Sequence, residues 1–140
     1  MNLIFRTDTA GIDWERVVAI LCDAGMANHT AERHKLAFEN SHTVVFVFDS
    51  EKMIGFGRAL SDGAYQAAIY DVAVLPGYQG RGIGKIIVEK IVQNCLDCNL
   101  ILYAAPGKEK FYEKLSFRRM KTGMALFTDQ EKMTGRGFTE

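Results

Sequence analysis

The sequence predicts an α/β fold in which one mixed β-sheet is flanked by helices on both faces. Segments rich in β-branched and aromatic residues alternate along the chain with segments whose apolar residues recur at helical spacing. A glycine-rich run, residues 79–85, lies between a strongly apolar strand segment and an amphipathic helix segment. The 140 residues, 48% of them hydrophobic, are enough for one sizeable core, so we expect a single domain.

The first half of the chain predicts a strand, two helices and a hairpin. Thr30 is suited to cap the second helix, whose apolar stripe is weak. A polar turn at residues 49–52 joins two β-branched and aromatic segments, which is typical of a hairpin. In chain order, the expected elements are a strand at 3–6, helices at 14–22 and 31–40, and strands at 43–48 and 53–60.

The second half predicts a central strand, a long helix and a late helix followed by strands. Residues 66–75 are apolar at nearly every position from Ala67 on, as expected for a strand covered on both faces, and Pro76 ends it. The further expected elements are a helix over 83–95 with the glycine run as its first turn, a strand at 100–104, a helix at 108–115 and strands at 117–121 and 124–128. Residues 129–140 are polar and predict a loose tail, so the predicted domain spans residues 1–128.

The charge balance excludes a global attraction to nucleic acid or to an anionic membrane, because 17 basic residues offset 17 acidic ones. No apolar run approaches the roughly 20 residues that span a bilayer, and the N-terminus lacks a basic segment followed by an apolar one. Three cysteines cannot all pair with one another, which suits a reducing compartment. We therefore expect a cytosolic protein with neither a nucleic-acid nor a membrane partner.

The cysteines and histidines do not predict a metal or redox site. Cys95 and Cys98 form a lone C-x-x-C, which is an alternative redox pair, but Cys95 falls on the apolar face of a predicted helix and Cys98 lies near a strand start. Burial is the favoured interpretation. The three histidines have no second cluster of ligands and no H-E-x-x-H pattern, so we expect no metal.

The run Q-G-R-G-I-G-K at residues 79–85 predicts a phosphate-binding loop. Glycines at alternate positions let successive N–H groups turn toward one anion, and the following helix adds its positive end. A nucleoside triphosphate loop is excluded because Ile86 stands where a hydroxyl is required, and a dinucleotide fingerprint counted from Gly80 has Lys85 in place of its last glycine. A purely structural glycine turn is the remaining alternative.

The pattern Q-x-x-G-x-G after Ala73-Val74-Leu75-Pro76 resembles the acetyl-coenzyme A loop of the GCN5-related N-acetyltransferase (GNAT) superfamily. Residues 111–117, F-Y-E-K-L-S-F, resemble that family's late F-Y-x-x-x-G-F segment, and the order of elements matches over about residues 3–127. The resemblance implies that the fourth and fifth strands splay apart to admit the pantetheine arm. It implies cofactor contacts, mostly from the backbone, at Val72, Ala73, Val74, Gln79, Gly80, Arg81, Gly82, Ile83, Gly84 and Lys85.

The same resemblance implies that Tyr112 is the general acid that protonates the leaving thiolate. A phenol of pKa about 10 is protonated at neutral pH and is well matched to a thiol near 8.5. The alternative is an aromatic side chain that packs in the core beside Phe111. Ser116 departs from the family's glycine, and it can adopt the left-handed conformation at a cost of roughly 1 kcal/mol. Arg81 and Lys85 add positive charge for an anion or are simply solvated.

The general base is less well defined. Period-two alternation from Val72 places Tyr70 and Ala68 on the face that the resemblance directs at the acetyl group, and neither is a good base. Asp71 is the only acid on this strand, and it should point the other way unless a β-bulge re-aims it. A role as base or substrate ligand, a structural hydrogen bond and a water chain all stay open.

The residues at the end of the preceding strand have two interpretations. Arg58 and Asp62 line the acceptor pocket or are solvated charges at its rim. The overall expectation is an N-acetyltransferase that moves an acetyl group from acetyl-coenzyme A to a primary amine of a small molecule, by direct attack and without metal. The alternatives are a protein lysine or N-terminal acetyltransferase and a non-catalytic acyl-coenzyme A-binding module. An exposed edge at residues 124–128 is a candidate contact for a homodimer.

Overall fold

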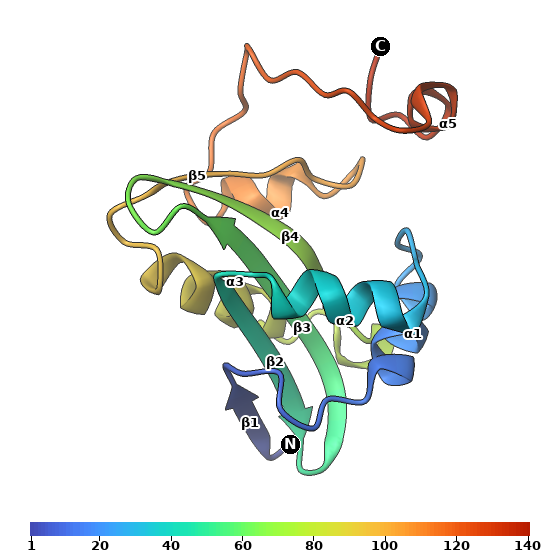
Figure 1. Ribbon diagram of the computed structural model, residues 1–140, viewed down its shortest axis with the longest axis vertical. Helices are drawn as coiled ribbons and strands as arrows, with labels where there is room; N and C mark the ends of the chain where they lie inside the picture. Colours follow the sequence, from blue (N-terminus) through green and yellow to red (C-terminus); the bar gives the residue numbers. More distant parts are fainter. The chain divides into compact units, whose positions relative to one another are not determined.

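A five-stranded mixed sheet organises the N-terminal part of the computed structural model, which describes residues 1–140 (Figure 1). The strands follow one another in space as they do in sequence, and only β5 runs parallel to its neighbour. Their bounds are β1 Leu3–Arg6, β2 Thr43–Asp49, β3 Lys52–Ser61, β4 Gln66–Val74 and β5 Asn99–Ile101. The predicted α/β class and mixed sheet are confirmed.

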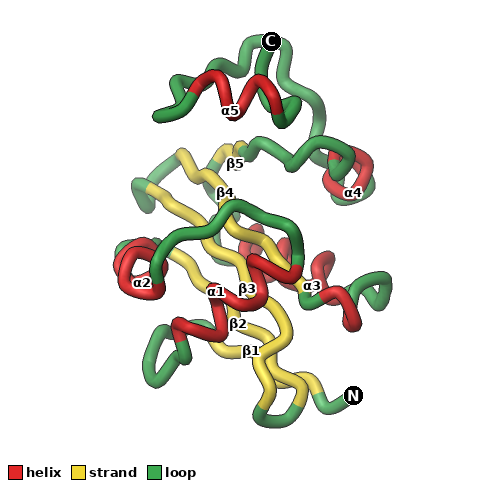
Figure 2. Tube along the Cα trace, turned by 90° about the vertical axis from the view of Figure 1, so that its right-hand side faces the viewer, coloured by secondary structure: helices red, strands yellow, loops and turns green.

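Helices lie on both faces of this sheet, as predicted. Helices α1 (Trp14–Asp23) and α2 (Ala31–Glu39) pack on one face, and α3 (Ile83–Gln93) packs on the other (Figure 2). The Thr30 side chain accepts a hydrogen bond of 3.2 Å from the backbone N–H of Arg33, so the predicted cap of α2 is confirmed. None of the helices reaches the length and hydrophobicity that a membrane-spanning helix requires.

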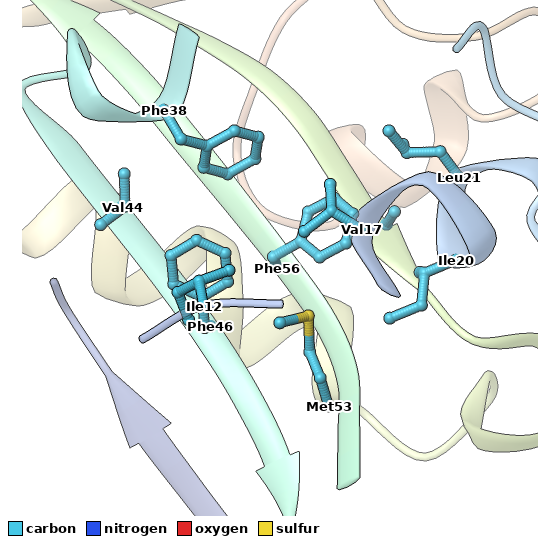
Figure 3. Packing of buried hydrophobic residues seen from close by; sticks show 10 residues of the cluster. Ile12, Val17, Ile20, Leu21, Phe38, Val44, Phe46, Met53 and Phe56 are labelled. Atoms are coloured by element: carbon cyan, nitrogen blue, oxygen red, sulfur yellow. The ribbon is translucent and has the colours of Figure 1, made fainter. Parts of the chain in front are cut away.

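The core beneath α1 and α2 is built around three aromatic rings (Figure 3). The ring of Phe38 lies 5.4 Å from that of Phe46 and 5.6 Å from that of Phe56, which fixes α2 against strands β2 and β3. The buried cluster consists of Ile12, Val17, Ile20, Leu21, Phe38, Val44, Phe46, Met53, Phe56 and Ala73.

Two glycines of β3 allow α3 to lie directly on the opposite face. A Cβ atom at Gly57 would come within 2.8 Å of Ile87 Cγ2, and one at Gly55 would come within 2.8 Å of the Ala73 carbonyl oxygen. Ile87 and Ile91 are fully buried, and burying each such side chain stabilises the fold by about 1.5–3 kcal/mol. This close packing anchors α3 beside β3 and β4 and thereby fixes the position of its N-terminus.

Strands β4 and β5 pair over a short stretch, because β5 ends at Ile101. They pair only from Gln66 with Asn99 to Ala68 with Ile101, so the outer edge of β4 from Ile69 onward has no strand partner. The early end of this pairing agrees with the splayed arrangement that the family resemblance implies, and the splay itself stays a prediction, because the chain beyond Leu102 belongs to the second unit.

Residues Tyr103–Glu140 form a second compact unit with helices α4 (Glu109–Glu113) and α5 (Gln130–Gly135). The strands predicted at 117–121 and 124–128 are absent, because a strand needs a hydrogen-bonded neighbour that local propensity does not supply. The predicted loose tail is also wrong in part, since α5 forms there. Within this unit the ring of Tyr103 lies 5.5 Å from that of Phe127 and 5.9 Å from that of Phe138, which ties the last residues down.

Candidate active site

The glycine run forms a left-handed bend immediately before α3. Gly80 has φ +78° and Gly82 has φ +80°, and Gly82 is the N-cap residue of α3. The helix therefore begins after the bend. The expectation that the glycine run forms the first turn of the helix is wrong for residues 79–82. A Cβ atom added at Gly80 or Gly82 would meet no atom within 4 Å, so the glycines serve backbone conformation and leave open space.

This bend has the features of an anion cradle. No side chain caps the N-terminus of α3, so the first N–H groups of the helix have no partner within the helix or from a cap. Such groups, together with the positive end of the helix dipole, attract phosphate. The open space at Gly80 and Gly82 is where a bound group can approach the backbone closely.

The Gln79 side chain makes a structural hydrogen bond that the sequence did not predict. Its Nε2 donates a hydrogen bond of 2.8 Å to the carbonyl oxygen of Val74, the last residue of β4. We had assigned Gln79 only backbone contacts with the cofactor. The side chain instead ties the start of the glycine bend to the end of the strand, so that loop and strand edge keep one geometry.

The free edge of β4 presents a backbone donor close to the bend. The Leu75 N–H donates to the Ile54 carbonyl at 2.8 Å and therefore points toward β3. Because successive N–H groups of a strand point to opposite sides, the Val74 N–H points away from β3, toward the outer edge of β4. A ligand lying along that edge can accept from it.

A β-bulge in β4 changes the expected side-chain directions. The register shifts between Phe56 and Arg58 of β3, and Asp71 has φ +55°. The Val72 side chain lies on the α3 face against Gly57, whereas Tyr70 lies 5.4 Å from the Arg58 guanidinium on the α2 face. The expectation that Val72 and Tyr70 share a face is therefore wrong, because the bulge inserts one residue between them.

The bulge also turns Asp71 toward Arg58. The Arg58 Nε donates to Asp71 Oδ2 at 2.7 Å, and the side chains are 14% and 24% exposed respectively. The guanidinium also lies 5.6 Å from the Phe38 ring and donates from Nη1 to Ser41 Oγ at 3.3 Å. Of the two interpretations of Arg58, the solvated rim charge is wrong, since this side chain is mostly covered and donates hydrogen bonds from both Nε and Nη1.

Asp62 belongs to a turn. Its Oδ1 accepts the backbone N–H groups of Ala64, Tyr65 and Gln66 at 2.8, 2.9 and 3.1 Å. These hydrogen bonds lower the pKa of the carboxyl group. Asp62 therefore fixes the connection from β3 to β4, a role that neither of its interpretations included.

Tyr112 lies on α4, in the second unit. Its ring packs edge-on against those of Phe111, at 4.9 Å, and Phe117, at 5.9 Å. Burial raises the pKa of the phenol, which keeps the hydroxyl protonated at neutral pH. The ring is thus packed among aromatic side chains and also has the protonation state that a general acid needs.

Ser116 adopts the left-handed conformation predicted for it, with φ +74°. The Phe117 N–H donates to the Tyr112 carbonyl at 3.1 Å and the Ser116 N–H donates to the Glu113 carbonyl at 3.0 Å, which is the hydrogen-bond pattern of a Schellman cap. This cap follows the end of α4 at Glu113 and fixes the backbone that carries the Tyr112 side chain.

The two cations of the glycine run have weak partners. The Arg81 guanidinium lies 5.5 Å from the Tyr78 ring, and Lys85 Nζ lies 3.8 Å from Glu89 Oε1 at the exposed surface. Exposed pairs of this kind contribute little stability. Cations at a helix N-terminus are unfavourable for the helix dipole, and a bound anion would reverse that effect.

A buried histidine, not singled out by its sequence pattern, lies in α2. His34 is 3% exposed, and its Nε2 accepts a hydrogen bond of 3.0 Å from the His29 backbone N–H. Burial lowers the pKa of His34, and the charge of Asp71 opposes that shift in part. Cys95 is buried as expected and lies 3.8 Å from Thr43 Oγ1, and no disulfide is formed.

Comparison with known proteins identifies the family and the fold of the chain. Residues 14–117 match the model of the Acetyltransferase (GNAT) family. The chain belongs to the GNAT family. The predicted resemblance to the GNAT superfamily is therefore confirmed, and the glycine run lies within the matched residues.

Three relatives of this GNAT chain illustrate the match. Serotonin N-acetyltransferase 2, chloroplastic, of Oryza sativa subsp. japonica is 30% identical over 139 residues, which cover 91% of this chain and 69% of that protein. Histone acetyltransferase TAP1 of Glycine max is 33% identical over 119 residues, covering 74% and 52%. A crystal structure of SA2161, a probable acetyltransferase from Staphylococcus aureus, has a TM-score of 0.77 at 28% identity, covering 89% of this chain and 98% of that one.

The first curated relatives are longer than this chain, which spans about half to two thirds of their length. Their names also correct one expectation. The rice protein and two GCN5-related N-acetyltransferases of Arabidopsis thaliana are chloroplastic by name. The cytosolic location expected from the cysteines and the N-terminus is contradicted by these relatives, because neither feature distinguishes one reducing compartment from another.

Proposed function

We propose that this GNAT domain transfers an acetyl group from acetyl-coenzyme A to a primary amine of a small molecule. The observation that carries the proposal is the left-handed bend at Gly80 and Gly82, held by Gln79 against the open edge of β4. The bend offers N–H groups to a pyrophosphate, and the edge offers the Val74 N–H to a pantetheine amide or to the thioester carbonyl. The two features lie next to each other along the chain, as one extended ligand requires.

The residues fit this donor in several respects. Gly80, Gly82 and the first turn of α3, which contains Ile83, Gly84 and Lys85, surround the proposed diphosphate position. Val72, Ala73 and Val74 form the strand edge, and Arg81 contributes positive charge at the surface. Directed N–H groups at a developing oxyanion account for a large part of acyl-transfer catalysis, and losing one such donor slows the reaction roughly a hundred- to thousandfold.

Bound acetyl-coenzyme A supplies a thioester whose acetyl carbon accepts the amine nitrogen. In the proposed direct attack, a carbon–nitrogen bond forms, the carbon–sulfur bond breaks and the amine loses one proton. Tyr112 donates its phenolic proton to the departing thiolate and regains one from solvent. Burial raises the pKa of this phenol, so the hydroxyl carries a proton to donate at neutral pH.

Asp71 is the proposed ligand for the incoming ammonium group and the first acceptor of its proton. The bulge places its carboxylate on the α2 face, at the part of β4 that pairs with β3 but has no partner on its outer edge. The hydrogen bond of 2.7 Å from Arg58 Nε holds the carboxylate in place, and its exposed part can accept from an ammonium group. A water molecule can carry the proton onward to solvent.

The proposed class of acceptor, a small primary amine, is supported by the name of one relative. The rice protein, which aligns over 91% of this chain, is a serotonin N-acetyltransferase by name, and serotonin is a small primary amine. The soybean relative, a histone acetyltransferase by name, supports a protein lysine as the second candidate. We further propose a plastid location, which the chloroplastic names of the relatives support.

One assay series tests the proposal. Purified protein is titrated with acetyl-coenzyme A and with coenzyme A by calorimetry, and release of free coenzyme A is then followed with serotonin, tryptamine, spermidine and a histone tail peptide. Binding together with thiol release in the presence of a small amine supports the proposal. Binding without thiol release indicates an acyl-coenzyme A-binding module, and release with the peptide alone indicates a protein acceptor. Absence of binding would refute the proposed function.

A further inference from the structure

We propose that the Arg58–Asp71 pair makes the acceptor site selective for amines that carry no carboxylate beside the amino group. This inference rests on the proposed function, whose acceptor class it narrows. It concerns the difference between an amine such as tryptamine and the corresponding amino acid, which share a side chain and an amino group and differ by one negative charge.

Asp71 is both fixed and reachable. Its left-handed backbone, φ +55°, and its 2.7 Å hydrogen bond from Arg58 Nε hold the carboxylate in one place, and 24% of the side chain is exposed. It follows Ala68, the last residue of β4 that pairs with β5, by three positions, so it lies where the outer edge of the strand has no strand partner. An acceptor that approaches this part of β4 therefore meets a negative charge.

Arg58, in contrast, is turned inward. Only 14% of its side chain is exposed, and the guanidinium lies against the rings of Phe38 and Tyr70. Its Nε donates to Asp71 and its Nη1 donates to Ser41 Oγ. The usual means of recognising a carboxylate, a free arginine fork, is thus already occupied at this position.

The two observations together predict that the site prefers a positively charged group to a negatively charged one. An ammonium group gains an ionic hydrogen bond with Asp71, whereas a carboxylate on the neighbouring carbon of the acceptor is placed beside a like charge, and Arg58 already donates from Nε and Nη1 to other groups. Like-charge juxtaposition of this kind is an effective means of rejecting a competing ligand. We expect amines to be preferred over the matched amino acids by at least roughly tenfold in kcat/KM.

Matched acceptors test the inference on the unaltered protein. Thiol release is measured with tryptamine, tryptophan and tryptophan methyl ester, and with tyramine, tyrosine and tyrosine methyl ester. The esters keep the bulk of the amino acids but lack the negative charge. We expect both the amines and the esters to exceed the acids at least roughly tenfold in kcat/KM. Acids that react as well as their esters would overturn the inference while leaving the acetyltransferase function intact.

Asp71→Asn tests the residue itself. Asparagine keeps an oxygen that accepts from Arg58 and tolerates the left-handed conformation, but it removes the negative charge. The ratio of kcat/KM for tryptamine to that for tryptophan should fall at least roughly tenfold. Asp62→Asn is the matched control, because Asp62 holds a turn through backbone N–H groups, and its ratio should not change.

The outcomes separate the two proposals. An unchanged ratio in Asp71→Asn, with thermal unfolding and acetyl-coenzyme A affinity like those of the unaltered protein, would overturn the assignment to Asp71. Should the variant fail to fold, the comparison of acids with esters on the unaltered protein still decides. Absence of thiol release with every acceptor would overturn the proposed acetyl transfer, and the selectivity with it.

Discussion

Gly82→Ala separates the two reasons for which a glycine can stand at the head of α3. Gly82 has φ +80°, so alanine there incurs left-handed strain of about 1–2 kcal/mol. The smaller entropy of an unfolded chain with alanine returns about 0.4–1 kcal/mol. No atom lies within 4 Å of the added Cβ, so a steric clash contributes nothing in the free protein. The net loss is therefore roughly 1 kcal/mol, or about 3–5 °C in Tm.

Gly63→Ala provides the matched control. Gly63 also has a left-handed φ, +73°, and an added Cβ there also meets no atom within 4 Å, but it lies in the turn between β3 and β4. We expect the two variants to lose similar stability in calorimetric scans. Titration with coenzyme A should then show a loss of affinity of at least roughly tenfold for Gly82→Ala alone, because only there does the methyl group occupy the space proposed for the diphosphate. Equal affinities for the two variants would refute the assignment of the bend.

Three further predictions concern other parts of the chain. Tyr112→Phe should slow acetyl transfer roughly a hundredfold or more while coenzyme A affinity, measured by calorimetry, stays nearly the same; unchanged turnover would remove the general-acid role. Ser116→Gly relieves left-handed strain at φ +74° and should raise the free energy of unfolding, measured in urea, by about 0.5–1 kcal/mol. The lowered pKa of His34 means that the unfolded chain binds more protons than the folded one below pH 6.5, so stability should fall as the pH drops from that value. Urea midpoints at pH 7.5 and 5.5 should therefore differ less in His34→Gln, and an undiminished difference would assign the effect to other groups.

The sequence predicted those parts of the fold that local patterns specify. The amphipathic period of α1 and α3, the cap at Thr30 and the polar turn between β2 and β3 each act within a few residues, and each is found in the structure. The segment 117–128 failed because a strand depends on a neighbour that can lie anywhere in the chain. An aromatic residue can be buried without belonging to a strand. Phe127 illustrates this, because its ring packs against those of Tyr103 and Phe138 outside any strand.

The candidate site was predictable where a backbone conformation demands a particular residue. Gly80 and Gly82 mark left-handed positions that other residues rarely occupy, and Ser116 was recognised as left-handed because it replaces a family glycine. Gln79 was found by its motif, but its hydrogen bond to the Val74 carbonyl depends on the path of the whole loop. No spacing in the sequence indicates which backbone atom a glutamine side chain will reach.

Asp71 shows why one irregularity matters more to function than several regular elements. In an unbroken strand its side chain would lie on the α3 face, among the residues that pack against Ile87 and Ile91. A single inserted residue moves it to the α2 face, where it accepts a hydrogen bond from Arg58 and part of its carboxylate stays exposed. No glycine or proline marks the position of the bulge. Aspartate tolerates φ +55°, so the sequence pattern does not indicate the bulge. The same bulge places Val72 on the opposite face, so the proposed donor edge and the proposed acceptor ligand lie side by side on one strand yet have side chains on different faces of the sheet.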